Sequence, residues 1–196
     1  MKSLRTILLL FVFLLPFVAQ AQQKKDSPFA LTTNFLSWAT LAPNLGGEVY
    51  IGKSCSVAVD GSFGMWGYSH TQRATQTWSV GGEARYWLQT GGSGFRRTHI
   101  GVSVRGGSFD SNFFTDGGRQ GEALLAGVTM GYRFALRGNW FVDAGLGLGY
   151  IHARYDRYIW NKRFGKYEFR SERTRDLFGL TDLHVSLVYR IPSKNR

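Results

Sequence analysis

The chain has 196 residues, of which 43% are hydrophobic, and a formal net charge of +11. This length suits one domain, and the single cysteine, Cys55, excludes an internal disulfide, so we expect it only to pack. So basic a cytosolic protein would suggest a nucleic-acid partner, but the N-terminus indicates export and argues against that function.

The N-terminus has the three parts of a secretory signal peptide. Two basic residues precede an apolar run, Ile7 to Val18, which ends in the small-residue sequence Ala19-Gln20-Ala21. The run is too short for a membrane-spanning helix, and the three parts match a signal peptide with its cleavage site. We therefore expect residues 1–21 to be removed and residues 22–28 to form a periplasmic N-terminal segment.

Further along the chain, apolar residues take alternate positions in eight segments: residues 29–35, 45–51, 55–65, 78–88, 98–107, 124–136, 140–153 and 181–191. Period two is typical of a strand with two different faces. Most segments have about the ~10 residues with which a tilted strand crosses a bilayer. Turn-forming residues predict tight turns at 52–54 and 137–139. The connections at 67–77, 108–121 and 155–180 are predicted to be long polar loops.

The two faces of these strands differ in content. One face carries apolar side chains without a charge, and the other carries nine charged residues among glycines and serines: Glu48, Asp60, Glu83, Arg85, Arg105, Arg133, Asp143, Asp182 and Arg190. Membrane barrels place the apolar face outward, and an eight-stranded interior is just wide enough for side chains to fill. We interpret the charges as an ion-pair network that closes the lumen, with an ion path as the alternative.

Aromatic residues at both ends of the apolar face favour a membrane barrel. They lie near the short turns at Tyr86, Phe134, Trp140 and Tyr189, and near the long connections at Trp78 and Tyr150. Membrane interfaces select such rings. The sequence thus predicts an all-β, eight-stranded antiparallel up-and-down transmembrane barrel at residues 29–191, located in the outer membrane, with a periplasmic tail at 192–196. The alternating glycines of DAGLGLGY would face the lumen and make room for arginines.

Several motifs resemble those of a known family: TNFL at Thr33–Leu36, PNLGGE at Pro43–Glu48, EARYW at Glu83–Trp87, RQGEALLAGVTMGY at Arg119–Tyr132 and FGLTDLHVSLVYRI at Phe178–Ile191. In this order and spacing they are similar to a Bacteroidota group of outer-membrane barrels, domain of unknown function 3575. The resemblance covers nearly the whole mature chain. It implies the fold, the location and an association with fimbrial or surface-assembly systems, but no catalytic residues.

One pair of residues suggests hydrolysis. His184 and Ser186 share a strand face and resemble the pair of outer-membrane lipid A deacylases, and Asp182 could orient the histidine. No acid follows Ser186, and the lumen would hide the pair from lipid, so we expect no catalysis. The other histidines stand at no metal-ligand spacing: His70, His99 and His152. We expect no metal and no cofactor.

The segment from Arg154 to Arg175 has eight lysines or arginines against three acids, interleaved with aromatics. Counting strands from a periplasmic N-terminus places it outside the cell. We predict a loop that binds anionic lipid or polysaccharide, because arginine pairs strongly with phosphate; a solvated pair of strand extensions is the alternative. The candidate contacts are Arg154, Arg157, Trp160, Lys162, Arg163, Lys166, Tyr167, Arg170, Arg173 and Arg175.

These observations favour a non-enzymatic, monomeric outer-membrane barrel with a role in envelope structure or surface adhesion. Its expected partners are outer-membrane lipids and lipopolysaccharide, with surface-fibre proteins or glycans as further partners and no nucleic acid. Two alternatives remain open. One is an accessory protein of a fimbrial or surface-fibre system, and the other is a lipid A or phospholipid hydrolase that uses His184 and Ser186.

Overall fold

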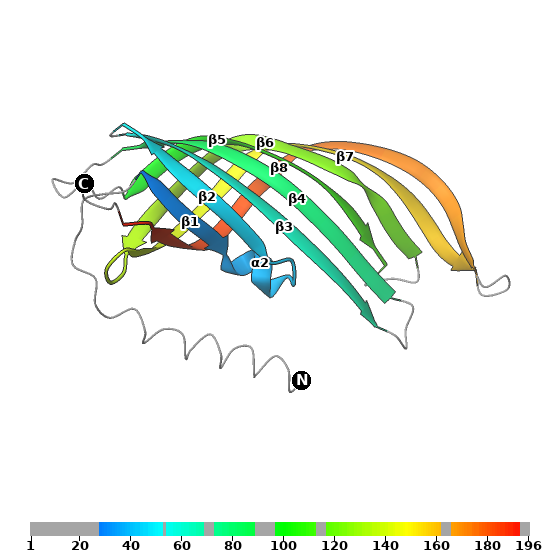
Figure 1. The fold of residues 1–196 in the computed structure, drawn as a ribbon. Coiled ribbons are helices and arrows are strands. Elements are labelled where there is room, and N and C mark those ends of the chain that lie inside the picture. Colours follow the sequence, from blue (N-terminus) through cyan, green and yellow to red (C-terminus); the bar gives the residue numbers. More distant parts are fainter. Residues whose placement is uncertain are drawn as a thin grey trace.

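The computed structural model describes residues 28–52, 54–68, 73–88, 97–112, 117–161 and 166–192. Eight antiparallel strands form a closed barrel, in which each strand pairs with its neighbours in the chain and the last strand returns to the first (Figure 1). The predicted eight-stranded up-and-down barrel is therefore confirmed. The predicted signal peptide, residues 1–21, lies outside the described residues.

The strands range from 6 residues in β1 to 25 residues in β8. Their bounds are β1 Phe29–Asn34, β2 Asn44–Ile51, β3 Cys55–Tyr68, β4 Arg73–Trp87, β5 Thr98–Ser111, β6 Gly117–Ala135, β7 Trp140–Asn161 and β8 Lys166–Arg190. The prediction of long loops at 67–77, 108–121 and 155–180 was wrong, because most of these residues are paired strand. That prediction ended each strand where the apolar alternation ends, whereas the backbone hydrogen bonds between strands continue where the side chains are polar.

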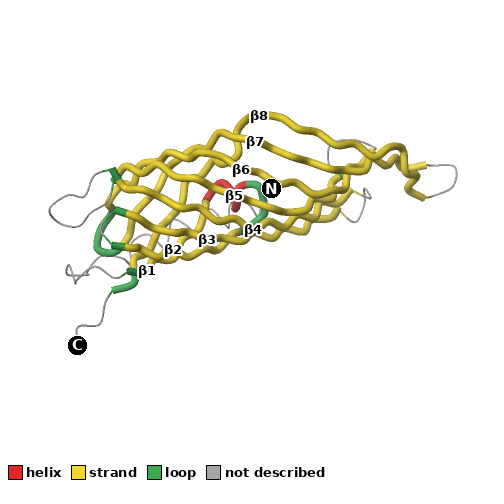
Figure 2. The backbone as a smooth tube through the Cα atoms, turned by 90° about the horizontal axis from the view of Figure 1, so that it is seen from above, coloured by secondary structure: helices red, strands yellow, loops and turns green. Residues whose placement is uncertain are grey.

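The two ends of the barrel differ. At one end, tight turns join β2 to β3 and β6 to β7, and each contains a glycine with positive φ, Gly52 at 61° and Gly138 at 67°. At the other end, β7 and β8 extend beyond the remaining strands as a long hairpin (Figures 1 and 2). We call these the short-turn end and the hairpin end.

The first strand is followed by a short helix, α2 (Phe35–Ala39), that the sequence did not reveal, because five residues show no helical period. Asn34 caps it, accepting the Leu36 N–H at 3.0 Å. The same side chain accepts the Val185 N–H at 3.1 Å, and so it ties α2 to β8 beyond the end of β1. No helix among the described residues is long and apolar enough to cross a membrane.

The apolar strand face points out of the barrel. Large exposed side chains cover every strand from β2 to β8, among them Leu45, Val49, Val57, Val59, Val80, Val102, Val104, Val128, Met130, Leu146, Leu148 and Leu183. Half-exposed aromatic rings flank this band, with Tyr86 and Phe134 near the short turns and Trp78 and Tyr150 toward the hairpin end. Cys55, which we expected to pack, is exposed on this face.

The alternating glycines of β7 face the lumen, as predicted, but for a different reason. A Cβ on Gly145 would lie 2.6 Å from Cε1 of His184, and one on Gly147 would lie 3.0 Å from Cβ of Asp182. The room is taken by these side chains of β8, so the prediction that arginines fill it was wrong. An arginine does occupy such a space elsewhere, above Gly81 of β4.

Candidate functional site: a sealed polar lumen

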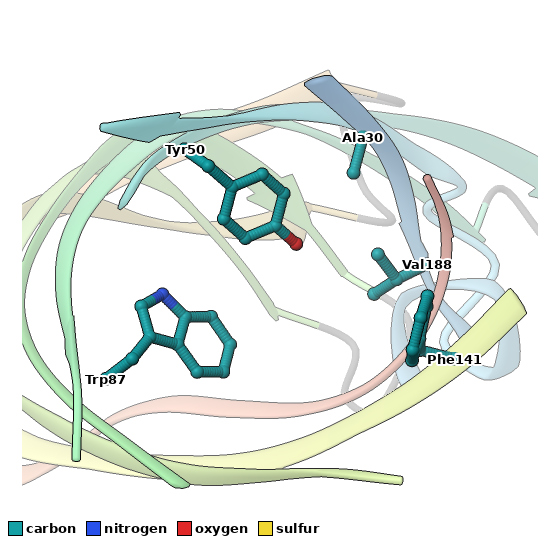
Figure 3. Close-up of a cluster of buried hydrophobic side chains, with 5 residues drawn as sticks. All are labelled: Ala30, Tyr50, Trp87, Phe141 and Val188. Carbon is teal, nitrogen blue, oxygen red and sulfur yellow. The ribbon is translucent and has the colours of Figure 1, made fainter. Parts of the chain in front are cut away.

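A layer of buried apolar side chains lies in the lumen at its short-turn end. Five strands contribute to it, and Figure 3 shows their side chains pointing into the barrel: Ala30, Tyr50, Trp87, Phe141 and Val188. Bulky filling of this kind is what the narrow interior of an eight-stranded barrel accommodates. We call this layer the floor of the lumen.

Next to the floor lies a buried cluster of five of the nine predicted lumen charges. Arg133 Nη2 is 2.9 Å from Glu48 Oε2 and 2.5 Å from Asp143 Oδ2. Arg85 reaches the same Asp143 oxygen at 3.1 Å and binds Glu83 Oε2 at 2.6 Å. None of the five side chains is more than 11% exposed. Two guanidinium groups and three carboxylates thus pair with one another away from water, although Arg85 Nε has no hydrogen-bond partner among the described residues.

Neutral side chains complete this cluster, and two of them, Ser56 and Tyr50, were not singled out by the sequence analysis. Ser56 donates to Glu48 Oε1 at 2.6 Å, and Trp87 Nε1 donates to the Ser56 hydroxyl at 2.9 Å. Tyr50 donates to the other Glu48 oxygen at 3.0 Å. The Arg133 guanidinium carbon also lies 4.4 Å from the centre of the Trp87 ring, a cation–π distance. Strand parity, which places these residues on the charged face, is the signal that could have found them.

The other four predicted network members make different contacts. Arg105 binds Asp60 through two hydrogen bonds, of 2.7 and 3.0 Å. Asp182 pairs with His184 Nδ1 at 2.5 Å. The Arg190 guanidinium carbon lies 4.5 Å from the centre of the Tyr50 ring in the floor. The structure therefore divides the nine residues into a five-membered cluster, a separate ion pair and two residues with other contacts.

Two histidines from distant strands meet at the cluster. His99 Nε2 lies 3.1 Å and His184 Nε2 lies 3.9 Å from the same atom, Oδ1 of Asp143. Their rings are nearly parallel, at 12°, with centroids 6.3 Å apart. A cavity of about 50 Å³ borders this group, which is room for water-sized molecules. Its lining includes Asp143, His184 and Ser186.

The candidate hydrolase residues do not form a nucleophile–base pair. His184 Nδ1 is hydrogen-bonded to Asp182 Oδ2, which is the orientation of the histidine that a catalytic triad needs. Its other nitrogen, Nε2, is buried and has no hydrogen-bond partner among the described residues. Ser186, which a triad would place at that nitrogen, lines the cavity instead.

The predicted basic loop is a strand hairpin, so the alternative interpretation of strand extensions describes it. Five of the ten candidate residues can be placed on its described part: Arg154, Arg157, Arg170, Arg173 and Arg175. The side chains of the other five lie outside the described residues: Trp160, Lys162, Arg163, Lys166 and Tyr167. Residues 172–178 are exposed on both strand faces. Arg154 forms an exposed ion pair with Glu172.

A protein-family model described as a protein of unknown function, DUF3575, matches residues 7–191. No curated protein and no solved structure matches the chain significantly. The matched range contains all eight strands of the barrel and every charged residue of the lumen. This match confirms the family to which the sequence motifs pointed, and the chain belongs to the DUF3575 family.

Proposed function

We propose that this protein is a non-enzymatic outer-membrane β-barrel that serves envelope structure or surface adhesion. One observation carries the proposal, namely the inverted distribution of polarity across the barrel wall. On β6, Val128 is 64% exposed on the outer face, whereas Arg133 is 1% exposed in the lumen. The apolar outer face continues around the barrel, and a water-soluble protein does not expose an apolar band of this extent.

The aromatic residues support the same location. Tyr86 and Phe134 flank the apolar band at the short-turn end, and Trp78 and Tyr150 flank it toward the hairpin end. Two such girdles are typical of the two interfaces of an outer membrane. Because such barrels have short periplasmic turns, we place the short-turn end in the periplasm and the hairpin outside the cell.

The closed lumen supports a structural role over transport or catalysis. The floor and the five-membered charge cluster block the interior in succession, so we expect no steady conductance in planar bilayers. The hydrolase alternative lacks a hydrogen bond between Ser186 and His184 among the described contacts. We therefore expect Ser186→Ala to leave the acylation pattern of lipid A unchanged.

The second candidate, an accessory of a surface-fibre system, rests on one feature of β8. β1 pairs with β8 only from Ser186 to Arg190. Among the described strands, residues 166–182 of β8 therefore have a neighbour on one side only, which is β7. Unpaired backbone at a strand edge can accept a strand from another chain, and a fibre subunit would be such a partner.

Cell fractionation combined with gel migration tests the proposed location. We expect the protein in the outer-membrane fraction, and a band that shifts on heating because a folded barrel resists detergent. A soluble periplasmic marker and an inner-membrane marker serve as controls. Recovery with the soluble periplasmic marker, without a heat-dependent shift, would contradict the proposal.

A further inference from the structure

Two imidazole nitrogens and one carboxylate oxygen converge inside the lumen. His99 Nε2, His184 Nε2 and Asp143 Oδ1 all lie within 4.8 Å of one another. The other oxygen of Asp143, Oδ2, is held by Arg85 at 3.1 Å and by Arg133 at 2.5 Å. These two bonds orient the carboxylate, so that Oδ1 faces the histidine pair.

Each imidazole has a second carboxylate behind it. Asp182 Oδ2 is 2.5 Å from Nδ1 of His184, and Glu83 Oε1 is 3.9 Å from Nδ1 of His99. A carboxylate hydrogen-bonded to the far nitrogen orients a metal-binding histidine, and Asp182 is in that position for His184. Glu83 is beyond hydrogen-bond distance of His99, whose Nδ1 has no hydrogen-bond partner among the described residues. Both Nε2 atoms thus face Asp143 Oδ1, and a metal ion bound here would take the place of the proton that His99 Nε2 donates to this carboxylate at 3.1 Å.

One of these nitrogens, His184 Nε2, is 3.9 Å from Asp143 Oδ1, too far for a hydrogen bond. His184 Nε2 is buried in a side chain that is 7% exposed, and it has no hydrogen-bond partner among the described residues. Buried polar atoms are nearly always satisfied. The carboxylates next to the two rings, Asp143, Glu83 and Asp182, also outnumber the guanidinium groups that bind them, Arg85 and Arg133.

Glycines on the strands beneath the two imidazole rings leave room for these rings. Gly131 of β6 and Gly145 of β7 are direct partners across the sheet. A Cβ on Gly131 would lie 2.5 Å from His99 Nε2, and a Cβ on Gly145 would lie 2.6 Å from His184 Cε1. Both glycines are thus required for the rings to meet, and the bordering cavity of about 50 Å³ has room for a small ion and its water.

We propose that His99, His184 and Asp143 bind a divalent transition-metal ion, with Zn²⁺ as the reference ion and water from the cavity as a fourth ligand. Zn²⁺ bonds of about 2.0–2.1 Å place tetrahedral ligand atoms about 3.3 Å apart. His184 Nε2 and Asp143 Oδ1, now 3.9 Å apart, have to approach by about half an ångström. The ion links β5, β7 and β8 across the lumen and stabilises the closed barrel.

The site is tested with Co²⁺, whose visible absorption reports tetrahedral nitrogen and oxygen ligands, added to the full chain folded in detergent micelles. We expect one equivalent to bind, Zn²⁺ to displace it, and His99→Ala and His184→Ala each to abolish the signal. Asp182→Asn keeps the ligands and should weaken binding about 10–100-fold. His152→Ala is the matched control, because His152 also contacts a carboxylate, that of Asp176, but on the outer face, and it should bind like the parent.

A second measurement does not depend on whether the histidine variants fold. Zn²⁺ should raise the unfolding temperature of the parent barrel, and Mg²⁺, which prefers oxygen ligands, should not. No Co²⁺ signal in the parent, an unchanged signal in His184→Ala, or loss of the signal in His152→Ala would each overturn the proposal. An equal effect of Zn²⁺ and Mg²⁺ on the unfolding temperature would do the same. None of these outcomes bears on the membrane location.

Discussion

Arg133 and Asp143 are direct partners across β6 and β7, and the guanidinium binds a single carboxylate oxygen twice. Its Nε and Nη2 lie 3.2 and 2.5 Å from Asp143 Oδ2, and both side chains are 1% exposed. Arg85 reaches the same oxygen at 3.1 Å. Neither partner can therefore be removed without leaving a buried charge that water cannot reach.

Replacing this arginine, as Arg133→Met, should lower the free energy of unfolding by roughly 3–5 kcal/mol, because two carboxylates lose their shared buried partner. Urea titration of the barrel in lipid vesicles measures the loss. Arg154→Met is the matched control. Its ion pair with Glu172 has side chains 70% and 50% exposed, and such pairs contribute about 0–1 kcal/mol. Equal losses in the two variants would indicate that the lumen is open to water.

Adding one methyl group, as Gly145→Ala, should destabilise the barrel by about 1–3 kcal/mol, because the new Cβ meets the His184 ring and the β6 backbone at under 3 Å. The control is Gly82→Ala on β4, where the nearest atom is 3.8 Å away. Chemical denaturation of both variants gives the comparison. A Gly145→Ala barrel as stable as the Gly82→Ala barrel would mean that the lumen repacks freely.

A charge on the outer face, as Val128→Arg, should cost roughly 2–4 kcal/mol in a bilayer, because this position lies at mid-height of the apolar band. Phe178→Arg, near the edge of the band, should cost only about 0–1 kcal/mol. Unfolding in lipid vesicles measures both variants. If the outer face contacted water, the 64% exposed Val128 would tolerate arginine within about 0.5 kcal/mol.

Neutralising the hairpin, by changing Arg157, Arg170, Arg173 and Arg175 to glutamine, should weaken binding of the isolated barrel to lipopolysaccharide. The difference should shrink as salt is added, because exposed charges are screened. Binding measured across a salt series, with folding checked by gel migration, tests this. Replacing the same four arginines by lysine keeps the charge but removes bidentate phosphate binding. This variant therefore separates the effect of charge from the effect of arginine geometry. Unchanged affinity in the glutamine variant would show that these four arginines do not contribute to binding of lipopolysaccharide.

A carboxylate just beyond the outer aromatic girdle should titrate at unusually low pH. The Tyr150 hydroxyl donates to Asp176 Oδ1 at 2.5 Å, and His152 Nδ1 lies 2.6 Å away, and these contacts lower the Asp176 pKa below its usual 3.8. The stability they confer is present above the unfolded-state pKa and is lost as the pH falls through the folded-state value. Tyr150→Phe should raise this pKa, and Tyr86→Phe, at the other girdle, should not. NMR titration of the carboxyl carbon distinguishes these outcomes.

The sequence by itself determined which way each strand residue faces. Side chains of a strand alternate between its faces, which is a local property of the backbone, so Val128 could be placed outside and Arg133 inside without knowing their neighbours. Gly52 and Gly138 could be placed in turns for a similarly local reason, their tolerance of positive φ. Eight such two-faced segments with short turns were enough to predict the barrel.

Only the tertiary structure decided where the strands end and which lumen groups meet. Strand length at the hairpin end depends on backbone pairing with a neighbour, so polar residues such as Arg154 join the ladder without any apolar signal. His99 and His184 come from β5 and β8, and they converge on Asp143 of β7 because barrel closure and strand stagger bring them across a narrow interior. Stagger is a property of the whole ring, and no local pattern encodes it.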